Sequence, residues 1–105
     1  MASAARVVFV AVPRGAKAES LARRIVKARL AACVNLLPGV SHYRWKGKLH
    51  RDAETLMLIK TSSAKLPALK KWVRENHPYD VPEFLVVNVA AGAANYLSWL
   101  RDQVR

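Results

Sequence analysis

The spacing of apolar residues along the chain predicts its elements. A run of β-branched and aromatic residues from 6 to 12 ends at Pro13-Arg14-Gly15 and predicts a buried strand. From 16 to 31 the apolar positions recur at every third or fourth residue, which predicts an amphipathic helix. The expected apolar stripe consists of Ala18, Leu21, Ala22, Ile25, Ala28 and Ala32.

A long hairpin is expected next. Residues 33–43 read as a strand interrupted at Pro38-Gly39, residues 45–48 as a turn, and residues 54–60 as the return strand. Because proline cannot donate to a sheet ladder, the interruption predicts an edge strand, a bulge or a bend. Both arms are long for a small domain and would expose unpaired backbone. We therefore expect subunits to exchange strand edges.

The rest of the chain completes a known order of elements. A helix capped by Ser63 should end before Pro78, followed by a strand over 84–89 and a short helix over 95–103. The resulting order, βαββαβ plus a C-terminal helix, predicts an α+β, ferredoxin-like domain with an antiparallel sheet over residues 1–105. Two helices cover one face of such a sheet, so an apolar second face would favour a closed oligomer.

Composition and charge indicate which partners and which cellular compartment to expect. The formal net charge of +11 produces a field that attracts phosphate, acidic proteins and anionic membranes, although scattered lysines usually form a solvated surface. A single cysteine excludes an intrachain disulfide and favours a reducing compartment. The first six residues lack the pattern of a secretory signal, and no apolar run is long enough for a membrane span. We expect a cytoplasmic protein without membrane association.

Several motifs together resemble one family. They are Leu30-Ala31-Ala32-Cys33-Val34-Asn35, Pro38-Gly39, Ser41 with Tyr43, Trp45 and Gly47, Glu54 to Leu58 with Lys60-Thr61, His77-Pro78-Tyr79, Pro82-Glu83, and Tyr96 to Leu100. With these residues the chain resembles the CutA family of divalent-cation tolerance proteins. The resemblance implies a PII-like homotrimer with a role in divalent metal (copper) tolerance, homeostasis or signalling. It brings no established reaction and no required cofactor, so the chain is not expected to be an enzyme.

The resemblance also directs attention to a metal site. Members with a proposed copper site carry a cysteine where this chain has Val10 and a second histidine where it has Asn76, which leaves His77. His77 and Cys33 are therefore the candidate ligands for copper or another divalent metal. The competing interpretation makes Cys33 a small core residue and His77 a backbone-bonding turn residue. In a trimer, one ligand from each subunit could meet around an axis or at an interface.

A ligand pocket between subunits is a second hypothesis. The polar and aromatic residues inside the matching motifs are its proposed lining. Lys60 could meet a small anionic ligand, and Glu83 could pair with Lys60 or with a cation. The competing interpretation is that the aromatic residues pack at a subunit interface and that Glu83 forms a salt bridge. The lining residues are Tyr43, Trp45, Lys60, Tyr79 and Glu83.

Two other classes of function are weaker. Basic ferredoxin-like domains can bind nucleic acid by stacking bases on sheet aromatics, but the Lys/Arg-Gly-Phe type of motif is missing, so a nucleic-acid partner is not expected. Catalysis would need a nucleophile beside a base, and only Cys33 with His77 could supply that pair. Pro13-Arg14-Gly15 lacks the glycines of a phosphate-binding loop.

Overall fold

The predicted order of elements is confirmed. The computed structural model describes residues 4–105; residues 1–3, part of the stretch considered above for a secretory signal, lie outside the described residues. Over that range it contains β1 (Ala5–Pro13), α1 (Ala16–Lys27), β2 (Cys33–Trp45), β3 (Lys48–Ser62), the 3₁₀ turn η1 (Ser63–Lys65), α2 (Leu66–Asn76), β4 (Leu85–Asn88) and α3 (Ala94–Gln103).

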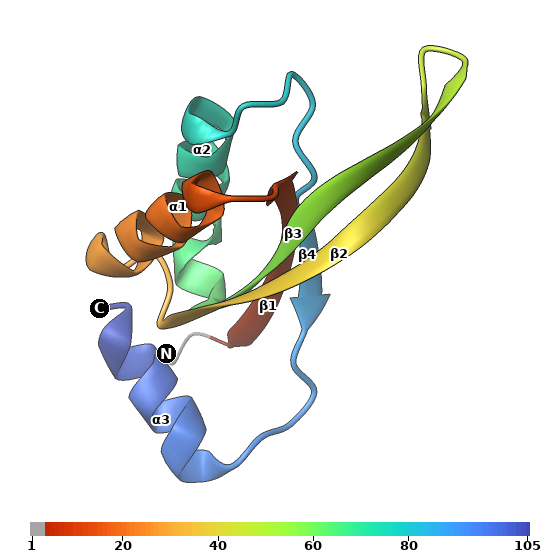
Figure 1. Cartoon of the computed structure of the whole chain (residues 1–105). Coiled ribbons are helices and arrows are strands. Elements are labelled where there is room, and N and C mark those ends of the chain that lie inside the picture. Colours follow the sequence, from red (N-terminus) through yellow and green to blue (C-terminus); the bar gives the residue numbers. More distant parts are fainter. Residues whose placement is uncertain (1–3) are drawn as a thin grey trace.

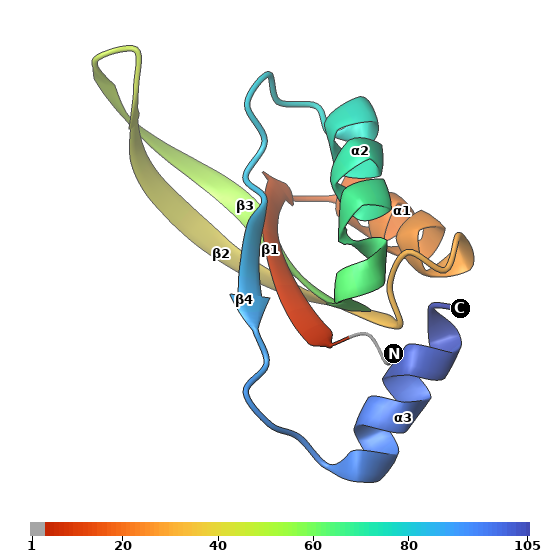
Figure 2. The same ribbon diagram turned by 180° about the vertical axis from the view of Figure 1, so that it is seen from behind.

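The sheet is antiparallel, with the strand order β2-β3-β1-β4, and α1 and α2 lie on one side of it (Figures 1 and 2). Side chains alternate between the two faces of each strand, so every second residue of β1 points toward the helices. Val8, Val10 and Val12 are fully buried on this face. Each such side chain contributes about 1.5–3 kcal/mol by its burial. The helices add Ala18, Leu21, Ile25, Leu69 and Val73 to the same core.

Helix α1 ends earlier than the apolar stripe predicts. It stops at Lys27, because Arg29 adopts a left-handed conformation (φ 59°). The amide of Arg29 donates to the carbonyl of Val26, and the amide of Leu30 donates to that of Ile25. These two bonds form a Schellman motif, which satisfies the last helical carbonyls. The chain can then turn directly into β2.

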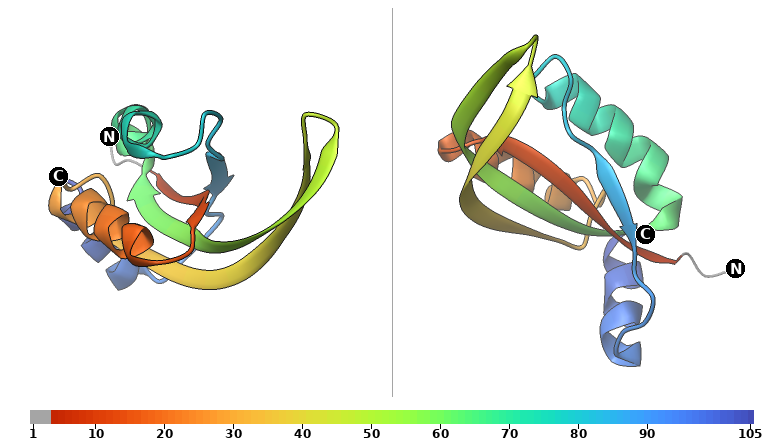
Figure 3. Two further views of the ribbon diagram at one scale, coloured as in Figure 1. Left: turned by 45° about the horizontal axis from the view of Figure 1, so that its top comes forward. Right: turned by 90° about the vertical axis from the view of Figure 1, so that its right-hand side faces the viewer.

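The hairpin is as long as expected, but its return strand begins at Lys48 rather than at residue 54. β2 and β3 pair from Cys33↔Lys60 to Trp45↔Lys48, whereas β1 pairs with β3 only as far as Glu54. Residues 40–53 therefore project beyond the sheet as the hairpin tip (Figure 3). Lys46 (φ 51°) and Gly47 (φ 79°) form the turn, with the positive φ values of a type I′ hairpin.

Two local expectations are corrected. No interruption occurs at Pro38-Gly39: β2 continues in unbroken register through both residues. The edge position that the proline predicted is confirmed, and a proline is tolerated there because one side of the strand needs no partner. Ser63 makes no cap bond to a helix; it begins η1, and its Oγ accepts the amide of Ala4 at 3.1 Å.

The face of the sheet opposite the helices is apolar, and no described element of the chain covers its centre. The strand register places Phe9 level with Leu58 and Leu85 on this face. Leu37 on β2 and Val87 on β4 also belong to it, and both are exposed, as is Leu85. Helix α3 packs instead at the end of the sheet, where Leu100 and Val104 contact Ala32 and Ala5. The second face is thus available for another copy of the chain.

Candidate functional site

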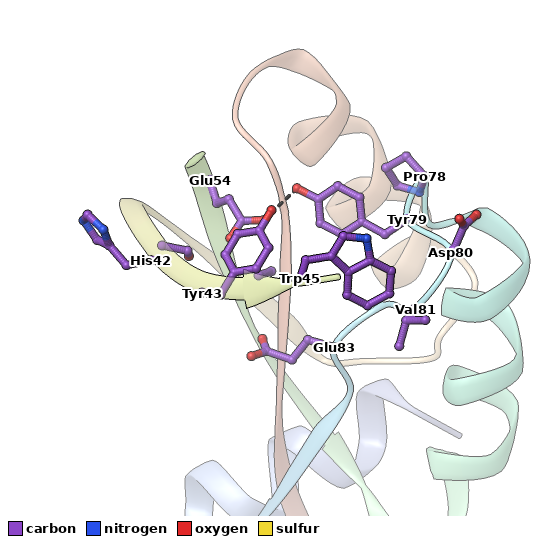
Figure 4. A pocket seen from close by; sticks show the side chains of 11 residues that line it. His42, Tyr43, Trp45, Glu54, Pro78, Tyr79, Asp80, Val81 and Glu83 are labelled. Carbon is purple, nitrogen blue, oxygen red and sulfur yellow. Dashed lines mark hydrogen bonds between the residues drawn. The ribbon is translucent and has the colours of Figure 1, made fainter. Parts of the chain in front are cut away.

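A cavity of about 610 Å³ lies between the hairpin tip and the loop that joins α2 to β4, residues 77–84. The tip contributes aromatic side chains, and the loop contributes aromatic, acidic and apolar ones. Figure 4 shows the rings of Tyr43, Trp45 and Tyr79 close to one another and to Glu54, whereas the ring of His42 points away from them. The lining residues are Ala11, Ser41, His42, Tyr43, Trp45, Glu54, Pro78, Tyr79, Asp80, Val81 and Glu83.

His77 holds the loop in place. Its Nε2 atom lies 2.7 Å from the carbonyl oxygen of Ala11, and its Nδ1 atom accepts the amide of Tyr79 at 3.0 Å. Because Nδ1 accepts, Nε2 carries the proton and donates to Ala11. The ring also packs against that of Tyr79, with centroids 4.7 Å apart. Both nitrogens of His77 are therefore engaged in protein contacts.

Two tyrosines of the site donate to carboxylates on β3. The Tyr79 hydroxyl donates to Glu54 Oε2 at 2.6 Å, and Glu54 is only 7% exposed. Burial of the Tyr79 hydroxyl, then its bond to Glu54 and the charge of Glu54, raise the pKa of Tyr79 strongly. The Tyr43 hydroxyl donates to Asp52, which raises the pKa of Tyr43. Both phenols are thus protonated hydrogen-bond donors at neutral pH.

Glu83 is the one lining carboxylate with a buried oxygen that lacks a partner. Its Oε1 atom is inaccessible and accepts no hydrogen bond within the described residues. Burial raises the pKa of Glu83, a backbone hydrogen bond from Ala11 opposes that effect, and the charge of Glu54 adds to it. A buried acceptor without a donor is unfavourable, and it destabilises the ionised form of Glu83.

The structure brings four of the five predicted pocket residues together. Tyr43, Trp45, Tyr79 and Glu83 all line the cavity, but Lys60 does not. The Lys60 Nζ atom lies 6.0 Å from the ring centroid of Tyr96, on α3. The predicted lining also missed Asp80 and Glu54, although Glu54 lies inside one of the matching motifs. A carboxylate at the start of the predicted return strand was the available signal for Glu54, because the hairpin folds that position back beside the aromatic residues.

The two candidate metal ligands lie apart within one chain. Cys33 on β2 pairs with Lys60 on β3, which in turn pairs with Val7 on β1, so Cys33 and Val7 lie at the same level of the sheet. His77 contacts Ala11, which lies four residues further along β1. This separation is about 13 Å along the strand. Residues 4–105 contain no group of three or more His, Cys, Asp or Glu side chains that could hold a metal ion. Cys33 and His77 therefore do not form a ligand set in one subunit, and a copper site on them stays a prediction.

Known proteins match the chain over nearly its whole length. The family model described as "CutA1 divalent ion tolerance protein" matches residues 6–103. The chain belongs to this CutA1 family. The resemblance deduced from the motifs is thereby confirmed.

Individual CutA1 relatives agree with that membership. The human "Protein CutA" is 49% identical over 95 residues, which are 90% of this chain and 53% of the relative. The "Divalent-cation tolerance protein CutA" of Thermus thermophilus is 45% identical over 97 residues, 91% of this chain and 94% of the relative. The crystal structure of CutA1 from Oryza sativa superposes with a TM-score of 0.95 at 43% identity, covering 99% of this chain and 96% of that one.

The CutA1 relatives differ in length and setting. The chain spans about half the length of the human and Arabidopsis thaliana relatives. The Arabidopsis relative is named chloroplastic, and a CutA of Archaeoglobus fulgidus is titled periplasmic. In the described part of this CutA1 chain, none of the helices is long and apolar enough to cross a membrane.

Proposed function

We propose that this CutA1 chain is a homotrimeric binding protein that contributes to divalent-metal tolerance by holding a small ligand, without catalysing a reaction. The family description and the name of the Thermus relative refer to tolerance of divalent ions, not to a reaction. The observation that carries the proposal is the hairpin tip, which overshoots its own sheet and forms one wall of a cavity. One element thus serves both assembly and binding.

The uncovered sheet supports assembly. Both edge strands, β2 and β4, lack a partner on their outer side within residues 4–105. Pairing of one edge with the other edge of the next copy is a heterologous contact, which closes into a ring when the rotation allows it. Burial of Phe9, Leu58 and Leu85 against other copies would then remove the exposed apolar face from water. A trimer is the ring that the family resemblance implies.

The cavity supports a binding role. Its volume lies in the usual range for small-molecule sites, which is about 300–1,000 Å³, and aromatic rings with a few polar groups form its walls. Because the tip extends from the sheet, the cavity lies where a neighbouring subunit of the trimer would come close. We propose that Tyr43, Trp45, Tyr79 and Glu83 contact the ligand, at or near a subunit interface.

A nucleic-acid interface gains no support from the arrangement. The exposed tyrosines and tryptophans lie on the hairpin tip, on the 77–84 loop and on α3, not on the central strands where bases would stack. The residues concerned are Tyr43, Trp45, Tyr79, Tyr96 and Trp99.

Native mass spectrometry of the purified protein tests the proposed function. We expect a species of three times 11.7 kDa, carrying any retained metal or small molecule as added mass. A monomer at micromolar concentration would contradict the assembly. Copper should then be titrated into the trimer, with a variant in which the histidines are replaced as the control. Equal copper uptake by both would remove the histidine-based metal site and leave the trimer in place.

A further inference from the structure

The acidic residues of this basic chain are concentrated around the cavity. Of the seven acidic residues, Glu54, Asp80 and Glu83 line it, and Asp52 accepts a hydrogen bond from the lining residue Tyr43. Within the described part of the chain, the lining includes no lysine or arginine. The charged side chains that line the cavity are therefore opposite in sign to the net charge of +11.

The walls of the cavity are aromatic. Tyr43, Trp45 and Tyr79 contribute rings, and ring faces attract cations. One intramolecular example is already present, because the Lys46 Nζ atom lies 5.9 Å from the ring centroid of Trp45. The combination of ring faces with a carboxylate is suited to an organic ammonium or guanidinium group.

A bare metal ion fits this cavity less well. Metal ions require several ligands that converge on one point, and residues 4–105 contain no such group of three. The lining carboxylate of Glu54 accepts the hydroxyl of Tyr79, whereas Glu83 lines the cavity with no hydrogen bond from another side chain of the described residues. Within the described residues, Asp80 and Glu83 are the lining carboxylates that accept no tyrosine hydroxyl. Two carboxylates beside aromatic rings can pair with an organic cation, but they do not supply the larger set of ligands that would enclose a metal.

We propose that the cavity binds an organic cation, an ammonium or guanidinium compound with an apolar group, using Glu83 as the counter-ion and the rings of Tyr43 and Trp45 as walls. The proposal rests on the proposed function, in which this cavity holds a small ligand, and it specifies the charge of that ligand. It replaces the small anion expected from the sequence, because Lys60, the residue meant to meet that anion, lies at α3.

Three probes of similar size and different charge test the proposal. Benzyltrimethylammonium, benzyl alcohol and benzoate should be titrated calorimetrically into the trimer at constant ionic strength. We expect the cation to bind about tenfold more tightly than the neutral alcohol, and benzoate not to bind in the cavity. The net positive charge of the protein opposes binding of cations to the surface in general, so a bound cation indicates a local site.

Variants locate the site. Glu83→Gln and Trp45→Leu should each weaken cation binding about tenfold. Glu19→Gln, which removes an exposed charge on α1, should leave it unchanged. Lys46→Gln keeps every lining residue and should strengthen binding several-fold, because it removes a positive charge beside Trp45. The last variant also tests the proposal if Glu83→Gln fails to fold.

The outcomes separate the two proposals. Binding of benzoate or benzyl alcohol that depends on Trp45, with no binding of the cation, would keep the ligand site and overturn the cationic class. Binding of the cation that Glu83→Gln leaves unchanged would also overturn it. If none of the three probes binds to an intact trimer, the binding role of the cavity fails, and only the assembly remains.

Discussion

The imidazole Nε2 atom of His77 donates to the carbonyl oxygen of Ala11 across 2.7 Å. β4 pairs with β1 only from Arg6 to Phe9. Beyond Phe9, β1 is still paired with β3 on one side, but its other side has no strand beside it within the described residues. His77 occupies the carbonyl of Ala11 there, and the carboxylate of Glu83 takes a hydrogen bond from the backbone of Ala11. The loop between α2 and β4 thus completes the sheet edge with side chains, and this contact positions the cavity.

Replacing His77 should loosen this loop. His77→Ala removes the bonds to Ala11 and to the amide of Tyr79, and we expect a loss of about 1–3 kcal/mol in the free energy of unfolding. Hydrogen exchange of the Tyr79 amide should accelerate. His42→Ala, at an exposed position on the tip, is the control and should change neither quantity. Unchanged exchange at Tyr79 in His77→Ala would refute the anchoring role.

The hydrogen bond between Tyr79 and Glu54 should contribute measurably to the free energy of unfolding. Tyr79→Phe removes only the hydroxyl and leaves the buried Glu54 carboxylate without that donor. We expect a loss of about 1–3 kcal/mol in urea denaturation at fixed protein concentration. Tyr96→Phe, at a half-exposed ring on α3, serves as the matched control and should lie within about 0.5 kcal/mol of the parent. Equal effects of the two substitutions would contradict this assignment.

Glu83 should give stability a specific pH dependence. Because burial raises its pKa, the folded protein holds this proton more tightly than the unfolded chain does. The contribution of Glu83 to stability is therefore greatest below the unfolded pKa of about 4.3 and declines as the pH rises through the raised pKa.

A comparison of variants isolates this contribution. In Glu83→Gln the decline should disappear from the profile of unfolding free energy against pH, whereas Glu75→Gln, on the exposed face of α2, should keep it. The profiles are measured by denaturation at a series of pH values. Parallel profiles for Glu83→Gln and the parent chain would show that the pKa of Glu83 is not raised.

Assembly should depend on the uncovered face of the sheet. Leu37→Asp places a charge on that face of β2, and we expect it to prevent the proposed trimer from forming at micromolar concentration. Val26→Asp on α1 is a matched control, since Val26 is 40% exposed and Leu37 is 43% exposed. Light scattering should then give a monomer mass for Leu37→Asp and a trimer mass for Val26→Asp. A trimer in both cases would place the interface elsewhere.

The elements could be predicted from the sequence because their signals are local. The stripe of Leu21, Ala22 and Ile25 is buried as expected, and Lys46-Gly47 lies in the expected turn. The exact ends were harder to predict, because they depend on individual residues. Arg29 ends α1 by adopting a left-handed conformation. An arginine gives no indication of that conformation in the sequence, because it is usually glycine or asparagine that adopts it.

Most of the aromatic part of the site was also predictable, because Tyr43, Trp45 and Tyr79 belong to recognisable motifs. The acidic part was not. Glu54 belongs to a matching motif but was not predicted to line the pocket, and Asp80 follows the His77-Pro78-Tyr79 motif without belonging to it. Their approach to the rings depends on the register of β3 and on the path of the 77–84 loop, which His77 sets through Ala11.

The sequence by itself determined the order of strands and helices, the family and the aromatic lining. Periodicity, turn chemistry and short motifs depend only on residues that are close together in the chain, so they can be read without the fold. Only the tertiary structure decided the charge of the cavity. Each strand residue points to one of two faces and lies at one level of the sheet, and the pairing register sets both. That register brings Glu54 to the rings of Tyr43 and Tyr79, and it carries Lys60 to the opposite end of the sheet, beside Tyr96.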